Sequence, residues 1–275
     1  MLMVGQSVVA DKFGKAAQTY NDFADVQARA ALLLAEDLQR ISPRVPSGPI
    51  LELGCGTGFF SQHLVEHLSQ RKILLSDISP DMVKVCRSRI QSPHVKFAVL
   101  DAETSTHWTQ QFALIASAFG AQWFSDLGTT FDGIYNSLLP GGYFVFSVPT
   151  NESFSEWKAL CSGENLTYTG NHLPNESKFR AFWSQRTDSF ELKTEKIQTK
   201  YGSSIEFFRA LKCIGATTTT GEPRSRREFG SPNLEPADGA LTSNLRRVIR
   251  RWDNSTDGPI VVTYEVMFGI VRRSK

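Results

Sequence analysis

Three glycines at alternate positions mark the stretch of this chain that is best suited to bind a ligand. They are Gly54, Gly56 and Gly58. They follow a short apolar run at 50–53 that is typical of a buried strand, and apolar residues recur every four positions after them, from Phe60 to Leu68, as on a helix. Because glycine has no Cβ, the backbone there can turn tightly and lie against a ligand. Strand, glycine turn and helix together predict that a nucleotide-type ligand lies over this turn.

An acidic residue beside the turn narrows the class of ligand. A dinucleotide fingerprint requires a third glycine at the position of Phe59, and a P-loop requires a Lys-Ser/Thr pair that the turn lacks. The carboxylate of Glu52 would repel a phosphate but would attract a cation, a ribose or an amine. The turn therefore predicts a ligand of that second kind, and the alternative is a glycine-rich turn that binds nothing.

Two aspartates stand where predicted strands end. Asp77 ends the strand predicted at 72–75, after Ser76, and Asp101 directly follows the strand predicted at 95–100. In an open α/β sheet, ligands bind beside the carboxyl ends of the strands. Asp77 could there accept hydrogen bonds from both hydroxyls of a ribose, and Asp101 could accept one from an adenine amino group. The alternative for each aspartate is to cap the helix that follows.

Aromatic residues follow the fourth predicted strand, 112–118, at the same edge of the sheet. Trp123 is expected to form a wall of the active site there, with Gln122 next to it, and the alternative for Trp123 is a position in the core. Tyr20 lies on a predicted N-terminal helix outside the sheet. Its hydroxyl can act only if that helix folds over the ligand as a lid; otherwise it is an ordinary surface or core group.

Basic residues crowd into residues 209–251, where acidic residues are fewer. They are Arg209, Lys212, Arg224, Arg226, Arg227, Arg246, Arg247, Arg250 and Arg251. Two interpretations are open: a solvated face of the protein, or a docking surface for an acidic partner or an anionic substrate. No metal site is expected, because His63 and His67 are spaced one helical turn apart but lack the H-E-x-x-H pattern.

Composition limits the classes of protein to which this chain can belong. The chain has 275 residues and a formal net charge of +2, which suits one large domain and argues against bulk binding to nucleic acid. Its four cysteines are widely separated, so they form neither a zinc motif nor a disulfide framework. The N-terminus lacks the long apolar region of a signal peptide, and the longest apolar stretch, 260–271, is too short to span a bilayer. We therefore expect a cytoplasmic protein without membrane contact.

Strands alternate with helices along most of the chain, which predicts a parallel α/β sheet. Strands are predicted at 50–53, 72–75, 95–100, 112–118, 143–148, 190–199 and 260–271. Helices are predicted within 12–40, where Asn21-Asp22 divides them, and at 80–90, 127–138, 177–185 and 205–214. Because the last strand is apolar almost throughout, we expect it inside the sheet. Residues 1–10 are expected to be a loose terminus, and 224–240 an irregular polar loop.

The glycine turn, Asp77, Asp101 and the segment Leu139-Pro140-Gly141-Gly142 together resemble the class I S-adenosylmethionine (SAM) methyltransferases. The resemblance covers residues 50–150. SAM carries a sulfonium, an ammonium and a ribose and no phosphate, in agreement with the carboxylate beside the turn. The chain departs from the family pattern at Phe112-Ala113, where these enzymes usually have an acidic residue after the aromatic one.

Segments on both sides of this region resemble the BioC-type malonyl-[acyl-carrier protein] O-methyltransferases of biotin synthesis. They lie at 13–20, 24–27, 121–123, 209–216 and 263–269. The resemblance implies a Rossmann-like class I methyltransferase fold, with a mostly parallel seven-stranded sheet, helices on both faces and a helical lid. It divides the chain into the lid, 1–45, a SAM-binding core, 46–150, later core elements with an inserted helical docking region, 151–259, and a closing strand, 260–275.

The same resemblance implies a reaction. A methyl group would pass from SAM to the free carboxylate of a malonyl group that is carried on the phosphopantetheine of acyl-carrier protein, or on coenzyme A. Because that carboxylate is ionised at neutral pH, no general base is needed. Two alternatives stay open: a SAM methyltransferase that acts on another small carboxylate, phenol or quinone, and a SAM-binding protein without catalysis.

The expected site has three parts. The residues expected to bind SAM are Glu52, Gly54, Cys55, Gly56, Gly58, Asp77, Ile78, Met82, Asp101, Ala102 and Phe119. The residues expected to be catalytic are Tyr20, Gln122 and Trp123. The residues expected to bind the substrate or its carrier are Arg209, Lys212, Arg246, Arg247 and Arg250. No metal ion is expected to take part.

Overall fold

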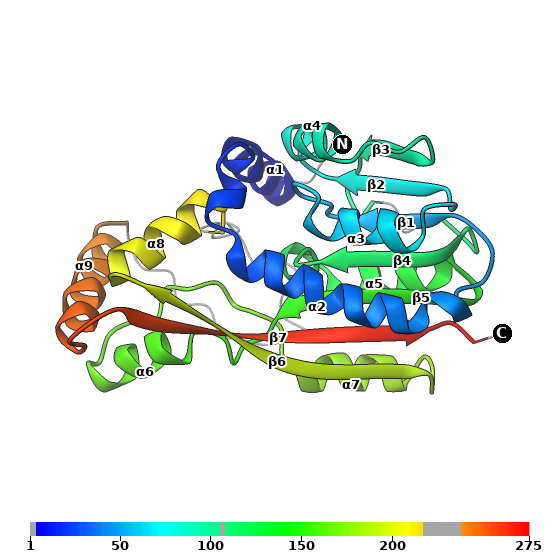
Figure 1. The fold of residues 1–275 in the computed structure, drawn as a ribbon. Coiled ribbons are helices and arrows are strands. Elements are labelled where there is room, and N and C mark those ends of the chain that lie inside the picture. The colour runs from blue at the N-terminus through cyan, green and yellow to red at the C-terminus, as the bar shows by residue number, and fades with distance from the viewer. Residues whose placement is uncertain (1–3, 105–107, 217–237, 275) are drawn as a thin grey trace.

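The fold is built on one seven-stranded sheet. The computed structural model describes residues 4–104, 108–216 and 238–274. Within them the strands lie in the order β3-β2-β1-β4-β5-β7-β6 (Figure 1). They are β1 Ile50–Leu53, β2 Ile73–Asp77, β3 Val95–Val99, β4 Phe112–Ala118, β5 Leu138–Pro149, β6 Phe190–Tyr201 and β7 Ile260–Arg272. The first five strands pair in parallel, and β7 is antiparallel to both of its neighbours. The predicted α/β sheet is confirmed, and β7 is an inner strand, as its apolar sequence predicts.

Helices cover both faces of the sheet. They are α1 Val4–Ala16, α2 Asp25–Ile41, α3 Phe59–His67, α4 Pro80–Arg89, α5 Leu127–Ser137, α6 Ser155–Gly163, α7 Glu176–Ser184, α8 Ser204–Cys213 and α9 Asp238–Asn254. One core includes the buried faces of α2 and α3, and the other lies under α5 and α7, where the rings of Phe131 and Trp183 stack with centroids 5.4 Å apart. Figure 1 shows α2 in front of the sheet and α7 behind it. None of the helices in the described part of the chain is both long and apolar enough to cross a membrane.

Local sequence explains the elements that carry the site. β1 is buried along its whole length, which suits the centre of a parallel sheet that is covered on both faces. α4 begins at Pro80, whose fixed φ fits the first turn of a helix. The hydroxyl of Ser79 caps this helix by accepting a hydrogen bond from the N–H of Met82 at 3.4 Å. These signals lie within a few residues of each other, so the sequence predicts both elements well.

The N-terminal segment corrects one expectation. Residues 4–10, expected to be loose, form the first part of α1. Val9 and Ala10 are buried, with 3% and 8% of their surface exposed, and α1 packs against α4. Contact with the rest of the fold, more than local propensity, therefore holds this helix. The predicted break at Asn21-Asp22 is confirmed, because the 3-10 turn η1, Tyr20–Asp22, separates α1 from α2.

Two helices are absent from the sequence prediction, α6 and α9. Each buries residues that lie one turn apart: Trp157 with Cys161 in α6, and Val248 with Trp252 in α9. α6 has no side-chain cap and follows Phe154, which has a positive φ of 62°. The sequence therefore contains no capping residue that would predict where this helix begins. α6 and α9 pack against each other, and long-range contact defines them both. The loop predicted at 224–240 lies outside the described residues up to position 237, and its last three residues belong to α9.

Candidate active site

The glycine turn joins β1 to α3. Its glycines all have positive φ angles, 74° at Gly54, 52° at Gly56 and 96° at Gly58, in a region that residues with a Cβ rarely adopt. A hydrogen bond from the N–H of Cys55 to the carbonyl of Ser76, 2.8 Å long, holds the turn against β2. Backbone geometry therefore favours glycine at all three positions, whatever the turn binds.

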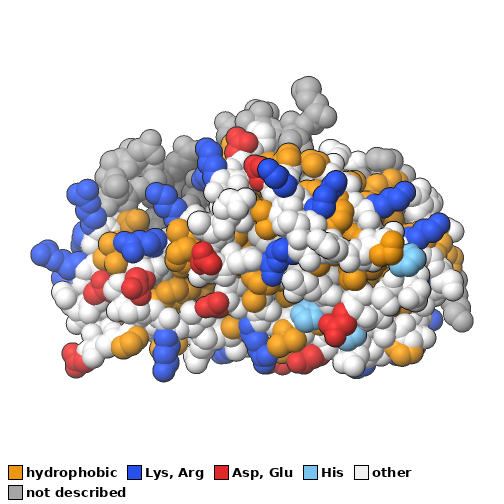
Figure 2. Space-filling model, turned by 45° about the horizontal axis from the view of Figure 1, so that its top comes forward, with side chains coloured by type: hydrophobic (Ala, Val, Ile, Leu, Met, Phe, Trp, Pro, Cys, Tyr) orange, Lys and Arg blue, Asp and Glu red, His pale blue; other side chains and the backbone are white. Residues whose placement is uncertain are grey.

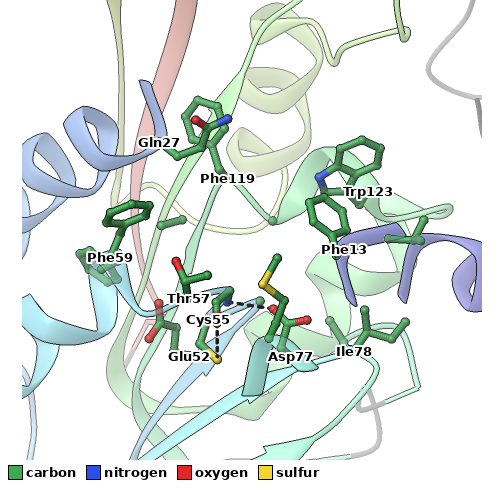
Figure 3. A pocket seen from close by; sticks show the side chains of 18 of the residues that line it. Phe13, Gln27, Glu52, Cys55, Thr57, Phe59, Asp77, Ile78, Phe119 and Trp123 are labelled. Carbon is green, nitrogen blue, oxygen red and sulfur yellow. Dashed lines mark hydrogen bonds between the residues drawn. The ribbon is translucent and has the colours of Figure 1, made fainter. Parts of the chain in front are cut away.

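A cavity lies over this turn, beside the ends of β1, β2 and β4, and we name it the turn cavity (Figure 3). All but one of the residues expected to bind SAM line it. They are Glu52, Gly54, Cys55, Gly56, Asp77, Ile78, Met82, Asp101, Ala102 and Phe119. The exception is Gly58, which caps the start of α3 and where a Cβ would lie 3.2 Å from the Sγ of Cys86. Gly58 therefore shapes the backbone of the turn without lining the cavity.

The carboxylate of Asp77 is fixed by backbone N–H groups at the edge of the turn cavity. Its Oδ2 accepts a hydrogen bond from the N–H of Gly56 at 2.9 Å, and its Oδ1 accepts one from the N–H of Ser79 at 2.8 Å. Burial raises the pKa of Asp77, and the backbone hydrogen bonds oppose that shift. Because Ser79 caps α4, the alternative role of Asp77 as the cap of that helix is wrong. Each carboxylate oxygen can still accept a bond from a ligand.

Asp101 and its neighbour Glu103 have different roles. Asp101 lines the turn cavity, and its Oδ1 accepts a hydrogen bond from the N–H of Glu103 at 3.0 Å. The carboxylate of Glu103 points away and accepts hydrogen bonds from the N–H groups of Ser125 and Asp126, at 2.8 and 2.9 Å. Burial raises the pKa of Asp101. Of these two acids, Asp101 is therefore the one that can meet a ligand, as its position directly after the strand predicts.

Glu52 is a buried carboxyl group on the floor of the turn cavity (Figure 3). Only 1% of its surface is exposed, and its Oε2 accepts a hydrogen bond from the hydroxyl of Ser61 at 2.6 Å. Burial raises the pKa of Glu52 to about 8, although the hydrogen bond from Ser61 opposes the shift. An ionised carboxylate here would gain from a cationic ligand, which would replace part of the lost hydration.

The N-terminal helices close the turn cavity from above. Val9 and Phe13 of α1, Tyr20 of η1, and Gln27 and Ala31 of α2 all line it. Of these residues, only Tyr20 was predicted from the sequence to have a role. A helical spacing of four residues, Val9 to Phe13 and Gln27 to Ala31, was the available signal for the others.

One hydrogen bond ties these N-terminal elements to the glycine turn. The hydroxyl of Thr57 donates to the Oδ1 of Asn21 at 2.6 Å. Thr57 is buried and lines the turn cavity, whereas Asn21 is exposed on η1. The two residues are 36 positions apart in the sequence, so only the tertiary structure reveals the pair.

Aromatic rings form a wall across the middle of the site. Phe13 lies edge-on to Trp123 with ring centroids 5.3 Å apart, and 6.4 Å from the ring of Tyr20. The ring of Tyr20 lies 6.4 Å from that of Phe59 on α3. Tyr20 and Trp123, expected from the sequence to be catalytic, are thus brought together with Phe13 between them. Burial raises the pKa of Tyr20 strongly, so its hydroxyl stays protonated and can donate a hydrogen bond.

A second cavity of about 370 Å³ adjoins the turn cavity, and we name it the side cavity. The two cavities share five residues of their walls: Phe13, Tyr20, Gln27, Phe119 and Trp123. Most of the remaining wall of the side cavity is apolar or aromatic. It includes Pro149, Phe154, Trp157, Leu173, Phe208, Leu211, Ile214, Leu245 and Tyr264. A ligand in one cavity can therefore meet a ligand in the other at the shared wall.

Gln122 lines the side cavity but not the turn cavity. Its Nε2 donates a hydrogen bond to the carbonyl of Phe119 at 2.8 Å. Its Oε1 is buried and accepts no hydrogen bond from the described residues. An orphan buried acceptor at a cavity wall is suited to bind a donor group of a ligand.

The basic residues expected to bind substrate or carrier lie outside both cavities. Arg209 and Lys212 are exposed on α8, and Arg246, Arg247 and Arg250 are exposed on α9. Other faces of the same two helices reach the side cavity through Phe208, Leu211 and Leu245. The basic surface therefore adjoins the side cavity but is not part of its described wall. Arg224, Arg226 and Arg227 lie outside the described residues.

Comparison with known proteins identifies sequence relatives along almost the whole chain. A family model described as "Methyltransferase domain" matches residues 50–142. The malonyl-[acyl-carrier protein] O-methyltransferase of Magnetococcus marinus is 30% identical over 97% of this chain and 92% of its own length. That of Acetivibrio thermocellus is 32% identical over 99% of this chain and 95% of its own length. The biotin biosynthesis bifunctional protein BioCD of Bordetella avium is 31% identical over 97% of this chain, which spans 52% of that longer protein.

Solved structures match the fold at lower identity. The YcgJ protein of Bacillus subtilis aligns with a TM-score of 0.60 and 14% identity, over 88% of this chain and 98% of its own. Phosphoethanolamine N-methyltransferase 2 of Haemonchus contortus, solved with S-adenosylhomocysteine, aligns with a TM-score of 0.50 and 17% identity, over 86% of this chain and 52% of its own. Both likenesses concern the α/β architecture and leave the substrate open.

Proposed function

The chain belongs to the malonyl-[acyl-carrier protein] O-methyltransferase family, and on this premise we propose that it methylates the free carboxylate of a malonyl thioester carried on acyl-carrier protein. SAM is the methyl donor, and the product is the malonyl methyl ester from which pimeloyl synthesis for biotin begins. The observation that carries the proposal is the pair of cavities with a shared aromatic wall. A donor in one and an acceptor in the other would meet where a methyl group can pass between them.

The turn cavity fits SAM by the chemistry of its walls. Its described walls carry three carboxyl groups, on Glu52, Asp77 and Asp101, and no lysine or arginine. Such a set suits a cationic nucleoside without phosphates. In this proposal Asp77 holds the ribose hydroxyls, Asp101 accepts from the adenine amino group, and Glu52 faces the ammonium. When bound, SAM supplies a methyl group that its sulfonium makes electrophilic.

The chain's own contribution to the reaction is placement and exclusion of water. A malonyl carboxylate oxygen bonds to the methyl carbon while the carbon–sulfur bond breaks, and no proton changes place. The rings of Phe13, Tyr20 and Trp123 surround the point where the cavities join. Holding two reactants in line can lower a barrier by up to about 7–11 kcal/mol. The protonated hydroxyl of Tyr20 can orient the carboxylate by donating a hydrogen bond to it.

The side cavity suits a malonyl group and the start of its thioester arm. The buried Oε1 of Gln122 can accept a hydrogen bond from an amide N–H of the arm, which phosphopantetheine and coenzyme A both contain. The apolar walls beyond it, such as Phe154 and Leu211, suit the methylene and methyl groups of that arm.

The carrier protein would dock on the basic surface of α8 and α9. Acyl-carrier proteins are acidic, and five basic side chains are exposed on these two helices: Arg209, Lys212, Arg246, Arg247 and Arg250. Figure 2 shows lysine and arginine side chains at the left end of the molecule as well as over much of the rest of this face. Figure 1 places α8 and α9 at the same end, beyond the ends of β6 and β7. A carrier that binds there would lie next to the side cavity, because the inner sides of the two helices line it. Charge of opposite sign would speed the encounter.

One assay tests the proposed function against its alternatives. The protein is incubated with methyl-labelled SAM and malonyl-acyl-carrier protein, malonyl-coenzyme A or free small acids, phenols and quinones. A labelled methyl ester on the carrier protein is expected. Transfer only to free small molecules would assign a different acceptor, and tight SAM binding with no turnover on any acceptor would make the protein a sensor or adaptor.

A further inference from the structure

The exposed side of α3 carries two histidines and a glutamate close together. They are His63, Glu66 and His67. The buried side of the same helix, with Phe60, Ser61 and Leu64, faces the core. One ligand atom from each of these three residues lies within 4.8 Å of the others; Glu66 is exposed and the two histidines are partly exposed. In residues 4–104, 108–216 and 238–274, no other group of three histidine, cysteine or acidic side chains meets this condition.

We propose that these three side chains bind a divalent transition-metal ion such as zinc, nickel or copper. Histidines four residues apart lie on one face of a helix, and Glu66 extends the same face by one position. Two imidazoles and a carboxylate form a familiar ligand set for zinc, in which water completes the coordination. Ligand atoms on a tetrahedral zinc ion lie roughly 3.4 Å apart, given metal–ligand distances of about 2.1 Å. Rotation of these surface side chains, which would shorten the spacing by up to about 1.4 Å, can bring the ligand atoms to that distance.

A contact within the cluster is long, and the cluster is open to solvent. His63 Nδ1 and Glu66 Oε2 are 3.9 Å apart, which is too far for a hydrogen bond. Their side chains are 26% and 72% exposed, so an ion can reach them from solvent. Figure 2 shows histidine side chains beside an acidic one on this face of the molecule. The expectation of no metal was based on the missing H-E-x-x-H pattern, which describes a catalytic site, whereas this cluster lies outside both cavities.

A bound ion would act on stability and not on the reaction. It would connect residues one turn apart near the end of α3, the helix that follows the glycine turn and packs against α2. A ligand that binds only the folded state raises the midpoint of thermal unfolding, and the stabilisation grows with the logarithm of its concentration relative to its dissociation constant. Zinc at about ten times its dissociation constant should raise that midpoint by about 2 °C in a protein of this size.

The test measures zinc and nickel binding to the full chain without a polyhistidine tag. Calorimetry should show one ion per chain, and thermal unfolding should show the upward shift. His63→Gln and His67→Gln should each weaken binding by at least about tenfold, the effect of losing one of three ligands. Glu66→Gln should weaken it by several-fold. The matched control is His94→Gln, because His94 is exposed but belongs to no such cluster, and it should bind the ion like the wild type.

Two results would overturn the site. One is the absence of one-to-one binding at millimolar ion. The other is equal affinity in the His67→Gln variant and the wild type, which would place any bound ion elsewhere, for example on the half-buried thiol of Cys213. SAM affinity, measured in the same His67→Gln protein, should be unchanged. The metal proposal and the methyltransferase proposal can therefore fail independently.

Discussion

Asp77 is the residue whose substitution tests the proposed cofactor site most directly. Asp77→Ala removes the acceptor that we assign to the ribose hydroxyls, and charge-assisted hydrogen bonds contribute about 1.5–3 kcal/mol. The dissociation constant of SAM should therefore rise by about tenfold or more. That of S-adenosylhomocysteine should rise equally, because both share the ribose. Unchanged calorimetric affinity would remove Asp77 from the site. Asp77→Asn keeps the shape of the side chain and one of the two acceptors for the N–H groups of Gly56 and Ser79, so comparing its thermal stability with that of Asp77→Ala separates loss of the turn from loss of ribose contact.

Glu52 should make the stability of the free protein depend on pH. Its pKa is raised to about 8 by burial in the folded protein, whereas in the unfolded chain a glutamate titrates at about 4.3. Between these values the folded state holds a proton that the unfolded state has lost. This group's contribution to the free energy of unfolding therefore falls as pH rises, by at most about 1.4 kcal/mol per pH unit.

The measurement compares wild type and Glu52→Gln by urea unfolding between pH 5.5 and 8.5 without SAM. The difference in unfolding free energy should widen with pH in favour of the glutamine variant, which cannot ionise. Parallel pH profiles would mean that Glu52 is not buried as a neutral acid. If Glu52 faces the ammonium of SAM, binding near pH 7 should also release a proton, and the Gln variant should release none.

At the scale of elements, the N-terminal helices are proposed to act as a lid that η1 latches to the glycine turn. Thr57→Val removes the hydroxyl that donates to Asn21 and keeps the shape of the side chain. One hydrogen bond contributes about 0.5–1.5 kcal/mol, so SAM should dissociate about two- to tenfold faster in stopped-flow chase experiments. Thr129→Val is the matched control, because its hydroxyl bonds to Asp126 at the start of α5.

Asn21→Ala separates the latch from direct ligand contact, since Asn21 does not line the turn cavity. It should raise the dissociation rate of SAM as much as Thr57→Val does. The double variant should add little, because both changes break the same bond. Additive effects would show that Thr57 acts on the ligand itself, and an unaffected Asn21→Ala protein would show that η1 is no latch.

At the scale of the whole molecule, the basic end should decide how the carrier protein is recognised. Arg209 and Lys212 are exposed and three residues apart on α8, so they share a face. Reversing both charges, Arg209→Glu with Lys212→Glu, should raise KM for malonyl-acyl-carrier protein about tenfold at low salt and less at high salt, where charges are screened. SAM affinity and Tm should stay near wild type.

Activity on a short malonyl thioester separates docking from catalysis. It should fall far less than activity on the carrier-bound substrate, because the small thioester makes no contact with α8. Lys84→Glu with Arg87→Glu reverses the same two charge types at the same spacing on α4, which does not line the side cavity, and should leave both KM values unchanged. Equal loss on both substrates would place Arg209 and Lys212 at the malonyl group, and no loss on either would make α8 an ordinary solvated face.

The sequence by itself determined the α/β class, the glycine turn and the acidic residues around it. These depend on signals within about ten residues: the run 50–53, glycines with positive φ, Pro80 at a helix start, and Asp77 and Asp101 at strand ends. In a parallel sheet, strand ends converge at one edge. Ten of the eleven expected SAM-binding residues consequently line one cavity without any knowledge of long-range contacts.

Only the tertiary structure decided the other half of the site. The side cavity draws its wall from segments as distant as Phe13, Trp157 and Tyr264, and the Thr57–Asn21 bond spans 36 positions. α6 has buried residues but no side-chain cap at its start, and α9, which buries Val248 and Trp252, was not predicted either. Such features arise because apolar faces select partners by shape and burial after the strands have assembled, and no local pattern encodes which partner is chosen.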